Sequence, residues 1–239
     1  MMRLHLLGIN GPFPESRGAT SGYLLEAGSS LFGFDLGSGV LGILTSLTAP
    51  EFLSALFVSH WHYDHTADIP VLMYRLAACL KSLPVYGPAD PSSPIFSLVS
   101  SSPCFDFREV SAGQTLILDH AEIRINAARH PVPAVGYCVS CDGKTFGYTG
   151  DTNTLPSLAV DYSGCNLLLA DGLFPADVWT EDKPHLSAEL AARLAADTES
   201  DCLIITHLNP FWPRKTLLQE ARREYPGVTL AAAGRVLPV

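Results

Sequence analysis

Apolar residues alternate with small or polar ones in several short stretches of the first half of the chain, which is the spacing of strands with one buried face. Strands are expected at 3–9, 22–26, 31–35, 55–59 and 84–86. Elsewhere the apolar residues return every three or four positions, as at Ile69, Leu72 and Leu76, and this spacing is typical of a helix. Helices are therefore predicted at 38–47, 67–80 and 94–101.

The second half continues with the same kinds of element. The pattern predicts strands at 105–110, 115–118, 123–128, 135–140, 144–149, 167–171, 202–206 and 228–231, and helices at 187–197 and 215–224. Asp142 and Gly143 form the expected turn of a hairpin. Two groups of strands, each followed by helices, predict a four-layer αββα sandwich in which two sheets pack face to face under helices. We expect one domain over 1–239.

Composition agrees with a large folded core and narrows the partners. Hydrophobic residues make up 47% of the chain and charged residues 16%, and the formal net charge is −9. No run of Lys or Arg stands out, and Arg222 and Arg223 fit a solvated helix face. An acidic surface repels polyanions, so long nucleic acid is not the expected partner. We expect a small-molecule substrate, and the sequence leaves a homodimer open.

Neither targeting nor disulfide chemistry is indicated by the sequence. No charged segment followed by a long apolar run opens the chain, and no apolar stretch is long enough to span a membrane. Cys138 and Cys141 have the spacing of a redox or zinc pair, but no second pair completes a four-thiolate site. They are expected to be buried free thiols in a strand, which fits a reducing, cytoplasmic compartment.

The strongest chemical signal directly follows the strand predicted at 55–59. Within six residues the sequence places three imidazoles and a carboxylate, at His60, His62, Asp64 and His65. Neutral imidazole and carboxylate are the ligands that Zn²⁺ prefers, and such a cluster is a poor choice for a loop that binds nothing. The spacing therefore predicts a metal site.

One loop cannot complete two metal sites, and further ligand types appear at other strand ends. His130 follows the strand at 123–128, Asp151 follows the strand at 144–149, and His207 follows the apolar run at 203–205. Each residue alone suits a surface position, but together with the loop they become candidate ligands. His5 and His120 have no such setting and are expected to play no part in the site.

These motifs resemble those of the metallo-β-lactamase superfamily over nearly the whole chain, and most closely its ribonuclease Z-like branch of small phosphodiesterases. Asp35 resembles the structural acid of the first family motif. The resemblance implies that His60, His62 and His130 hold one zinc ion, and that Asp64, His65 and His207 hold the other. It further implies that Asp151 bridges two Zn²⁺ ions, for which Mn²⁺ or Fe²⁺ could substitute.

Two more residues gain roles from the resemblance. His185, which precedes the helix expected from Ser187, matches an additional histidine of ribonuclease Z-like enzymes and is the expected general acid. Asp171 occupies the place of an acid that orients this histidine, although relatives often carry Glu there. The sequence departs from ribonuclease Z in lacking a protruding Gly- and Pro-rich arm, and Trp61 replaces a smaller residue in the metal loop.

The expected activity is hydrolysis of a small phosphodiester or nucleotide by a metal-bridging hydroxide, with Asp64 able to take a proton from the nucleophile. The first alternative is hydrolysis of a carboxylic ester, lactone or thioester, in which Tyr23 or Tyr148 would help to bind the oxyanion. A ribonuclease Z-type tRNA 3′ endonuclease and a non-catalytic binding protein of the same fold are the remaining alternatives.

Overall fold

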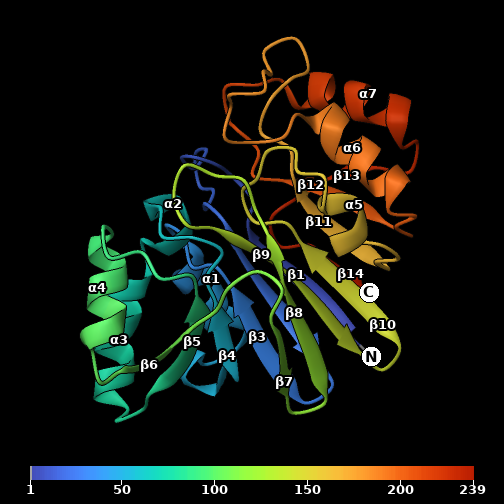
Figure 1. The fold of residues 1–239 in the computed structure, drawn as a ribbon. Coiled ribbons are helices and arrows are strands. Elements are labelled where there is room, and N and C mark those ends of the chain that lie inside the picture. The colour runs from blue at the N-terminus through green and yellow to red at the C-terminus, as the bar shows by residue number, and fades with distance from the viewer. Residues whose placement is uncertain (1) are drawn as a thin grey trace.

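The computed structural model describes residues 2–239; Met1, which the predicted domain includes, lies outside the described residues. Two seven-stranded mixed sheets face each other, with helices on both outer sides (Figure 1). This is the αββα arrangement expected from the sequence. No helix within the described range is long and apolar enough to cross a membrane.

The first sheet is built from the first half of the chain and the last strand. Its order is β14-β1-β2-β3-β4-β5-β6. The strands are β1 Met2–Gly8, β2 Gly22–Ala27, β3 Ser30–Phe34, β4 Ala55–Phe57, β5 Leu83–Gly87, β6 Phe105–Glu109 and β14 Val236–Pro238. The helical segments of this half are α1 Val40–Leu47, η1 Pro50–Phe52, α2 Tyr63–Thr66, α3 Ile69–Ala78 and α4 Pro94–Ser101.

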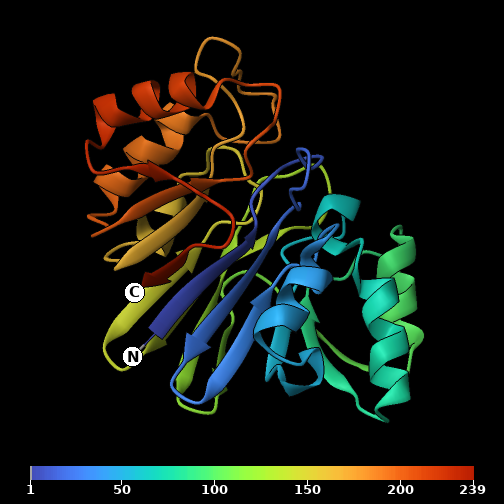
Figure 2. The same ribbon diagram turned by 180° about the vertical axis from the view of Figure 1, so that it is seen from behind.

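The second sheet has the order β13-β12-β11-β10-β9-β8-β7. Its strands are β7 Thr115–Leu118, β8 Ala121–Ala127, β9 Val135–Cys141, β10 Lys144–Tyr148, β11 Leu167–Asp171, β12 Leu203–Thr206 and β13 Thr229–Leu230. Its helices are α5 Leu158–Asp161, α6 Ala188–Asp197 and α7 Arg214–Glu224. The view from behind shows that α6 and α7 cover this sheet on the side opposite to α1, α3 and α4 (Figure 2).

The alternation along the strands explains the layers. In β4, Phe57 belongs to the core between the two sheets, whereas its neighbour Leu56 belongs to the cluster under α1 and α3. Successive residues of a strand point to opposite faces, so a strand covered on both sides needs apolar residues at both. Phe34, Phe57 and Tyr137 are packed against one another across the inner layer.

Four short elements escaped the sequence pattern: η1, α2, α5 and β14. The metal loop contains a helical turn, α2, because the amides of His65 and Ala67 donate to the carbonyls of His62 and Tyr63. Four mostly polar residues carry no hydrophobic periodicity that could have signalled it. β14 is three residues long and ends on a proline, and it pairs with β1 at the edge of the sheet, where a proline is tolerated.

The thiol predictions are confirmed for the pair in β9. Cys138 and Cys141 are both buried, and all six cysteines of the chain are free. Cys138 lies 3.9 Å from Cys165, sulfur to sulfur, in the interior rather than at the metal loop.

Candidate metal centre

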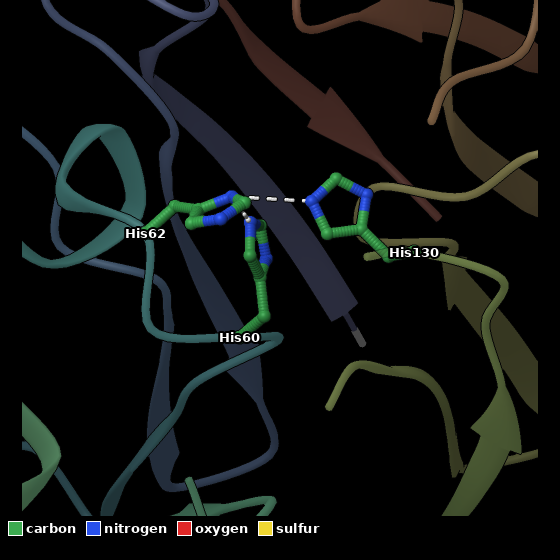
Figure 3. Close-up of side chains that lie close together, drawn as sticks. All are labelled: His60, His62 and His130. Atoms are coloured by element: carbon green, nitrogen blue, oxygen red, sulfur yellow. Dashed lines mark hydrogen bonds between the residues drawn. The ribbon is translucent and has the colours of Figure 1, made fainter. Parts of the chain in front are cut away.

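Three histidines converge at the end of the sandwich where β4 and β8 finish (Figure 3). His62 Nδ1 lies 3.0 Å from His60 Nε2 and 3.1 Å from His130 Nε2. Two nitrogens that share a tetrahedral zinc ion at about 2.0–2.1 Å are about 3.3–3.4 Å apart, close to these distances. A single nitrogen of His62 cannot carry a proton for both contacts, so the arrangement suits a shared cation better than hydrogen bonds alone.

A second group lies beside the first. Asp64 Oδ2 is 3.2 Å from His207 Nε2 and 3.7 Å from His65 Nε2. Asp64 and His65 come from α2, whereas His207 follows β12, so the fold joins residues 142 or more positions apart. The ligand atoms of these three residues all lie within 4.8 Å of one another, a spacing that allows one ion to be held.

One carboxylate oxygen faces both groups. Asp151 Oδ2 is 3.6 Å from His60 Nε2, 3.1 Å from His65 Nε2 and 3.4 Å from His207 Nε2. The structure thus brings together all seven residues that the sequence nominated as ligands. The two groups that the family resemblance implied are among four overlapping sets, one of which joins Asp171 and His185 to Asp151 and His207. Asp151 holds the position that a carboxylate bridging two ions would need.

The imidazoles are oriented by hydrogen bonds on the nitrogen that points away from the cluster. His65 Nδ1 donates to Asp35 Oδ2 at 2.7 Å, and His130 Nδ1 donates to the carbonyl of Pro184 at 3.1 Å. His60 Nδ1 lies 3.0 Å from Ser59 Oγ. These bonds aim Nε2 of each ring into the cluster, as is usual for histidines that bind a metal.

Asp35 holds the metal-loop residues in place through hydrogen bonds. Its carboxylate accepts hydrogen bonds from the amide and hydroxyl of Ser59, from His65 and from the hydroxyl of Tyr148. Asp35 is 1% exposed, so each of these bonds replaces a contact with water that the fold removes. The sequence suggested the acid but not its partners Ser59 and Tyr148.

Two of the site residues adopt strained backbone conformations. Asp35 has φ 55° and His207 has φ 56°, in the left-handed region that costs a residue with a side chain about 1–3 kcal/mol. At His207 the ring packs directly on Gly11, where an added Cβ would lie 2.0 Å from Nε2. Only glycine fits at position 11, a requirement that no motif in the sequence revealed.

The protonation states fit a cation-binding site. Burial and the charge of His65 hold the pKa of His60 well below its usual range, and burial also lowers the pKa of His62 and of His130. These three rings are therefore neutral, as metal ligands must be. Burial would lower the pKa of His65 as well, but the charges of Asp151, Asp35 and Asp64 outweigh it and raise that pKa.

The buried carboxylates of the site need positive charge to balance them. Asp35 and Asp151 are at most 3% exposed, yet no Lys or Arg of the described residues lies within ion-pair distance of either. His65 Nε2 and His207 Nδ1 are buried without a hydrogen-bond partner. Divalent ions would balance the charge and satisfy His65 Nε2, so the residues present fit the metals that the sequence implied.

His185 stands at the side of the cluster, where its ring stacks on His207 with centroids 4.9 Å apart and lies 5.3 Å from the ring of His130. Its Nδ1 is bonded to Asp171 Oδ2 at 2.9 Å, so the shorter carboxyl side chain does reach the histidine. Burial lowers the pKa of His185, but the charges of Asp171 and Asp151 prevail and raise it to about 9.

The tyrosines named for an oxyanion role do not lie at the site surface, and that prediction is wrong. Tyr23 is 1% and Tyr148 2% exposed, because both rings pack in the core between the sheets. The hydroxyl of Tyr23 is bonded to Thr206 Oγ1, and that of Tyr148 donates to Asp35. His5 pairs with Glu26 in the first sheet, as expected for a histidine outside the site.

Known proteins with similar sequences span almost the whole chain. The probable metallo-hydrolase YhfI of Bacillus subtilis is 29% identical over 242 residues, covering 98% of this chain and 99% of the relative. The crystal structure of YhfI superposes with a TM-score of 0.93 over 99% of this chain and 98% of that one. Ribonuclease Z of Prochlorococcus marinus is 26% identical, with 96% and 97% covered.

A diphosphatase of the PhnP family has the same fold, with a TM-score of 0.79, 16% identity, and coverage of 99% of this chain and 96% of that one. The model of the beta-lactamase superfamily domain matches residues 40–208, a range that includes both groups of candidate ligands. The chain therefore belongs to the β-lactamase superfamily and is a metal-dependent hydrolase of the metallo-β-lactamase fold.

Proposed function

We propose that this hydrolase is a dinuclear zinc phosphodiesterase for small phosphodiesters such as cyclic or short nucleotides, with His185 as the general acid. The observation that carries the proposal is the hydrogen bond of 2.9 Å between His185 Nδ1 and Asp171 Oδ2 beside the candidate ligands. When bound, the two ions would lower the pKa of water and stabilise negative charge on the phosphoryl oxygens.

His185 is suited to donate a proton. Because Nδ1 is held by Asp171, the proton on Nε2 is available for a departing alkoxide. The charge of Asp171 raises the pKa of His185 and favours the imidazolium, which is the form that can donate a proton. Asp171 does not touch the substrate in this proposal; it positions His185 and supports its charge.

Asp64 supplies the complementary proton acceptor. Its carboxylate oxygen Oδ2 lies between His65 and His207 at the same end of the sandwich. From there it can take a proton from the attacking water while it helps to hold an ion. The charge of His65 and the hydrogen bond of His207 counter the effect of burial and lower the pKa of Asp64, so the carboxylate is available at neutral pH.

Phosphodiester cleavage is favoured over acyl transfer by the groups present around the cluster. An alkoxide departing from phosphorus needs a proton, which His185 can give. Hydrolysis of an ester or thioester would gain from a hydroxyl donor for the oxyanion, and the hydroxyls of Tyr23 and Tyr148 are both occupied in the core.

A small substrate is favoured over precursor tRNA, which is the substrate that the similarity to ribonuclease Z suggests. The net charge of the chain is −9. The segment 172–187, which joins β11 to α6 and carries His185, contains Asp177, Glu181 and Asp182 but, besides that histidine, only one basic residue, Lys183. Both features repel a long polyanion.

A substrate panel on zinc-loaded protein tests the proposal. Bis-p-nitrophenyl phosphate, a γ-lactone, a thioester and a precursor tRNA are compared at equal enzyme concentration and physiological salt. We expect the phosphodiester to have the highest kcat/KM. A lactone or thioester hydrolysed with a kcat/KM above that of every phosphodiester would refute the assignment, as would efficient 3′ cleavage of the tRNA.

A further inference from the structure

A pocket of about 180 Å³ opens next to the first candidate metal group. His62 belongs to both, because its Nδ1 faces the cluster while the ring also lines the pocket. A group attached to a phosphate at the metal centre can therefore extend into this space.

The walls are mostly apolar and aromatic. Trp61 and Tyr63 come from the metal loop, Pro94 begins α4, and Val132 follows His130. Trp61 donates from its indole nitrogen to the carbonyl of Pro88 at 2.6 Å and packs edge-on against Phe96 of α4. The large residue that stood out between the first two histidines thus ties the metal loop to the opposite wall.

One charged group faces this pocket. Asp90 is only 5% exposed, and its Oδ1 accepts hydrogen bonds from the amide and hydroxyl of Ser92. No donor among residues 2–239 bonds to its other oxygen, Oδ2, which is also not among the fully buried atoms that lack a partner. A nearly buried carboxylate with one oxygen that no protein donor reaches is suited to accept a hydrogen bond from an N–H or O–H group of a bound molecule.

We infer that this pocket binds the base of a nucleotide and that Asp90 Oδ2 accepts a hydrogen bond from an exocyclic amino group, as in adenine or cytosine; this deepens the proposed phosphodiesterase function and rests on it. The exposed aromatic ring of Tyr63 suits a planar base, and carboxylates accept hydrogen bonds from base amino groups in other recognition sites. The negative charge of Asp90 also repels phosphate, so the phosphate remains at the metal centre and the base enters the pocket.

Binding rather than turnover tests this inference, so that it stands apart from the hydrolytic assignment. Zinc-loaded protein is titrated calorimetrically with adenosine 5′-monophosphate and with purine riboside 5′-monophosphate, which lacks only the amino group. Loss of one hydrogen bond to a charged group is expected to raise Kd by about 10- to 100-fold. Equal affinities would overturn the assignment of Asp90 even if the protein hydrolyses phosphodiesters.

The variant Asp90→Asn sharpens the test. Because Ser92 donates twice to Oδ1, the amide oxygen should take that place and turn its NH₂ group into the pocket, where it cannot accept from an amino group. The preference for the adenine nucleotide should then disappear, with metal content and melting temperature as checks of folding. Asp197→Asn, a control at the exposed end of α6, should keep the preference.

Two outcomes would overturn the inference. A preference for adenine that persists in Asp90→Asn would place the base elsewhere. O-phosphoethanolamine bound more tightly than adenosine 5′-monophosphate would assign the pocket to an aminoalkyl group, since an ammonium can also pair with Asp90 between aromatic walls. An inactive protein that still discriminates between the two nucleotides would refute the phosphodiesterase proposal but not the pocket assignment.

Discussion

Replacing His185 by alanine should lower kcat without removing a metal ion, by an amount that depends on the leaving group. The ring bonds to Asp171 through Nδ1, so its loss removes a proton donor while the seven candidate ligands remain. General acid catalysis contributes about 10²–10⁴-fold, or about 3–5 kcal/mol of barrier, when the departing group is a poorly stabilised alkoxide. A p-nitrophenolate leaving group scarcely needs a proton, so the loss of kcat with a p-nitrophenyl substrate should be far smaller.

The dependence of the rate on pH should also reveal the role of His185 as an acid. His185 must be protonated to donate, and the charge of Asp171 raises its pKa, so the rate with an alkyl leaving group should fall on the alkaline side of the profile. In Asp171→Asn the charge that supports the imidazolium is lost, and this fall should move to lower pH. The profile with p-nitrophenolate should show little of either effect.

The assay compares kcat for bis-p-nitrophenyl phosphate and for an alkyl nucleotide phosphodiester in the wild type, His185→Ala and His185→Gln, with zinc measured in each sample. Glutamine keeps a hydrogen bond to Asp171 but cannot act as an acid at this pH. Equal losses for both substrates would refute the acid role and indicate substrate positioning instead. Loss of one zinc equivalent would make His185 a ligand.

Further predictions concern the support of the site and its substrate range. Gly11→Ala should lower occupancy of the second metal position, measured by zinc analysis, because the added Cβ would overlap the ring of His207; unchanged zinc content and activity would contradict this. Tyr148→Phe removes a buried hydrogen bond to Asp35 and should lower the free energy of unfolding by about 1–3 kcal/mol in urea titrations. If the hydroxyl of Tyr148 were solvated instead, the substitution would leave the free energy of unfolding unchanged. Precursor tRNA should bind weakly, and because salt screens like-charge repulsion its Kd should not rise with salt; tight binding that weakens steeply as salt is added would reveal a basic contact surface and contradict the acidic-surface reasoning.

Regular amphipathic elements were accessible from the sequence because their burial repeats. α4 runs over 94–101 as predicted, and its N-cap is Ser93, whose hydroxyl oxygen accepts a hydrogen bond from the amide of Phe96. The ligand residues were accessible because metal chemistry restricts the residue types that can cluster after a strand. Both signals are local, and a single sequence displays them directly.

Features that depend on contacts between distant segments were not accessible. Ser59 and Tyr148 meet at Asp35 only after the two sheets pack together, and Gly11 meets His207 across 196 positions. The oxyanion role of Tyr23 was predicted incorrectly for the same reason, because the alternation of residues along β2 does not indicate which face of the strand packs in the core. Asp90 could not be distinguished from other acids of a loop until Trp61 and Pro94 were placed around it.

Metal stoichiometry tests the central claim, the dinuclear centre, most directly. Protein purified without chelator should contain close to two zinc equivalents per chain, with anomalous scattering at two positions flanking Asp151. Asp151→Asn should weaken both positions, since Oδ2 faces His60 as well as His65 and His207, whereas His65→Ala should empty mainly one. A fully active protein with one equivalent or none, or an Asp151 variant that retains both ions, would contradict the account.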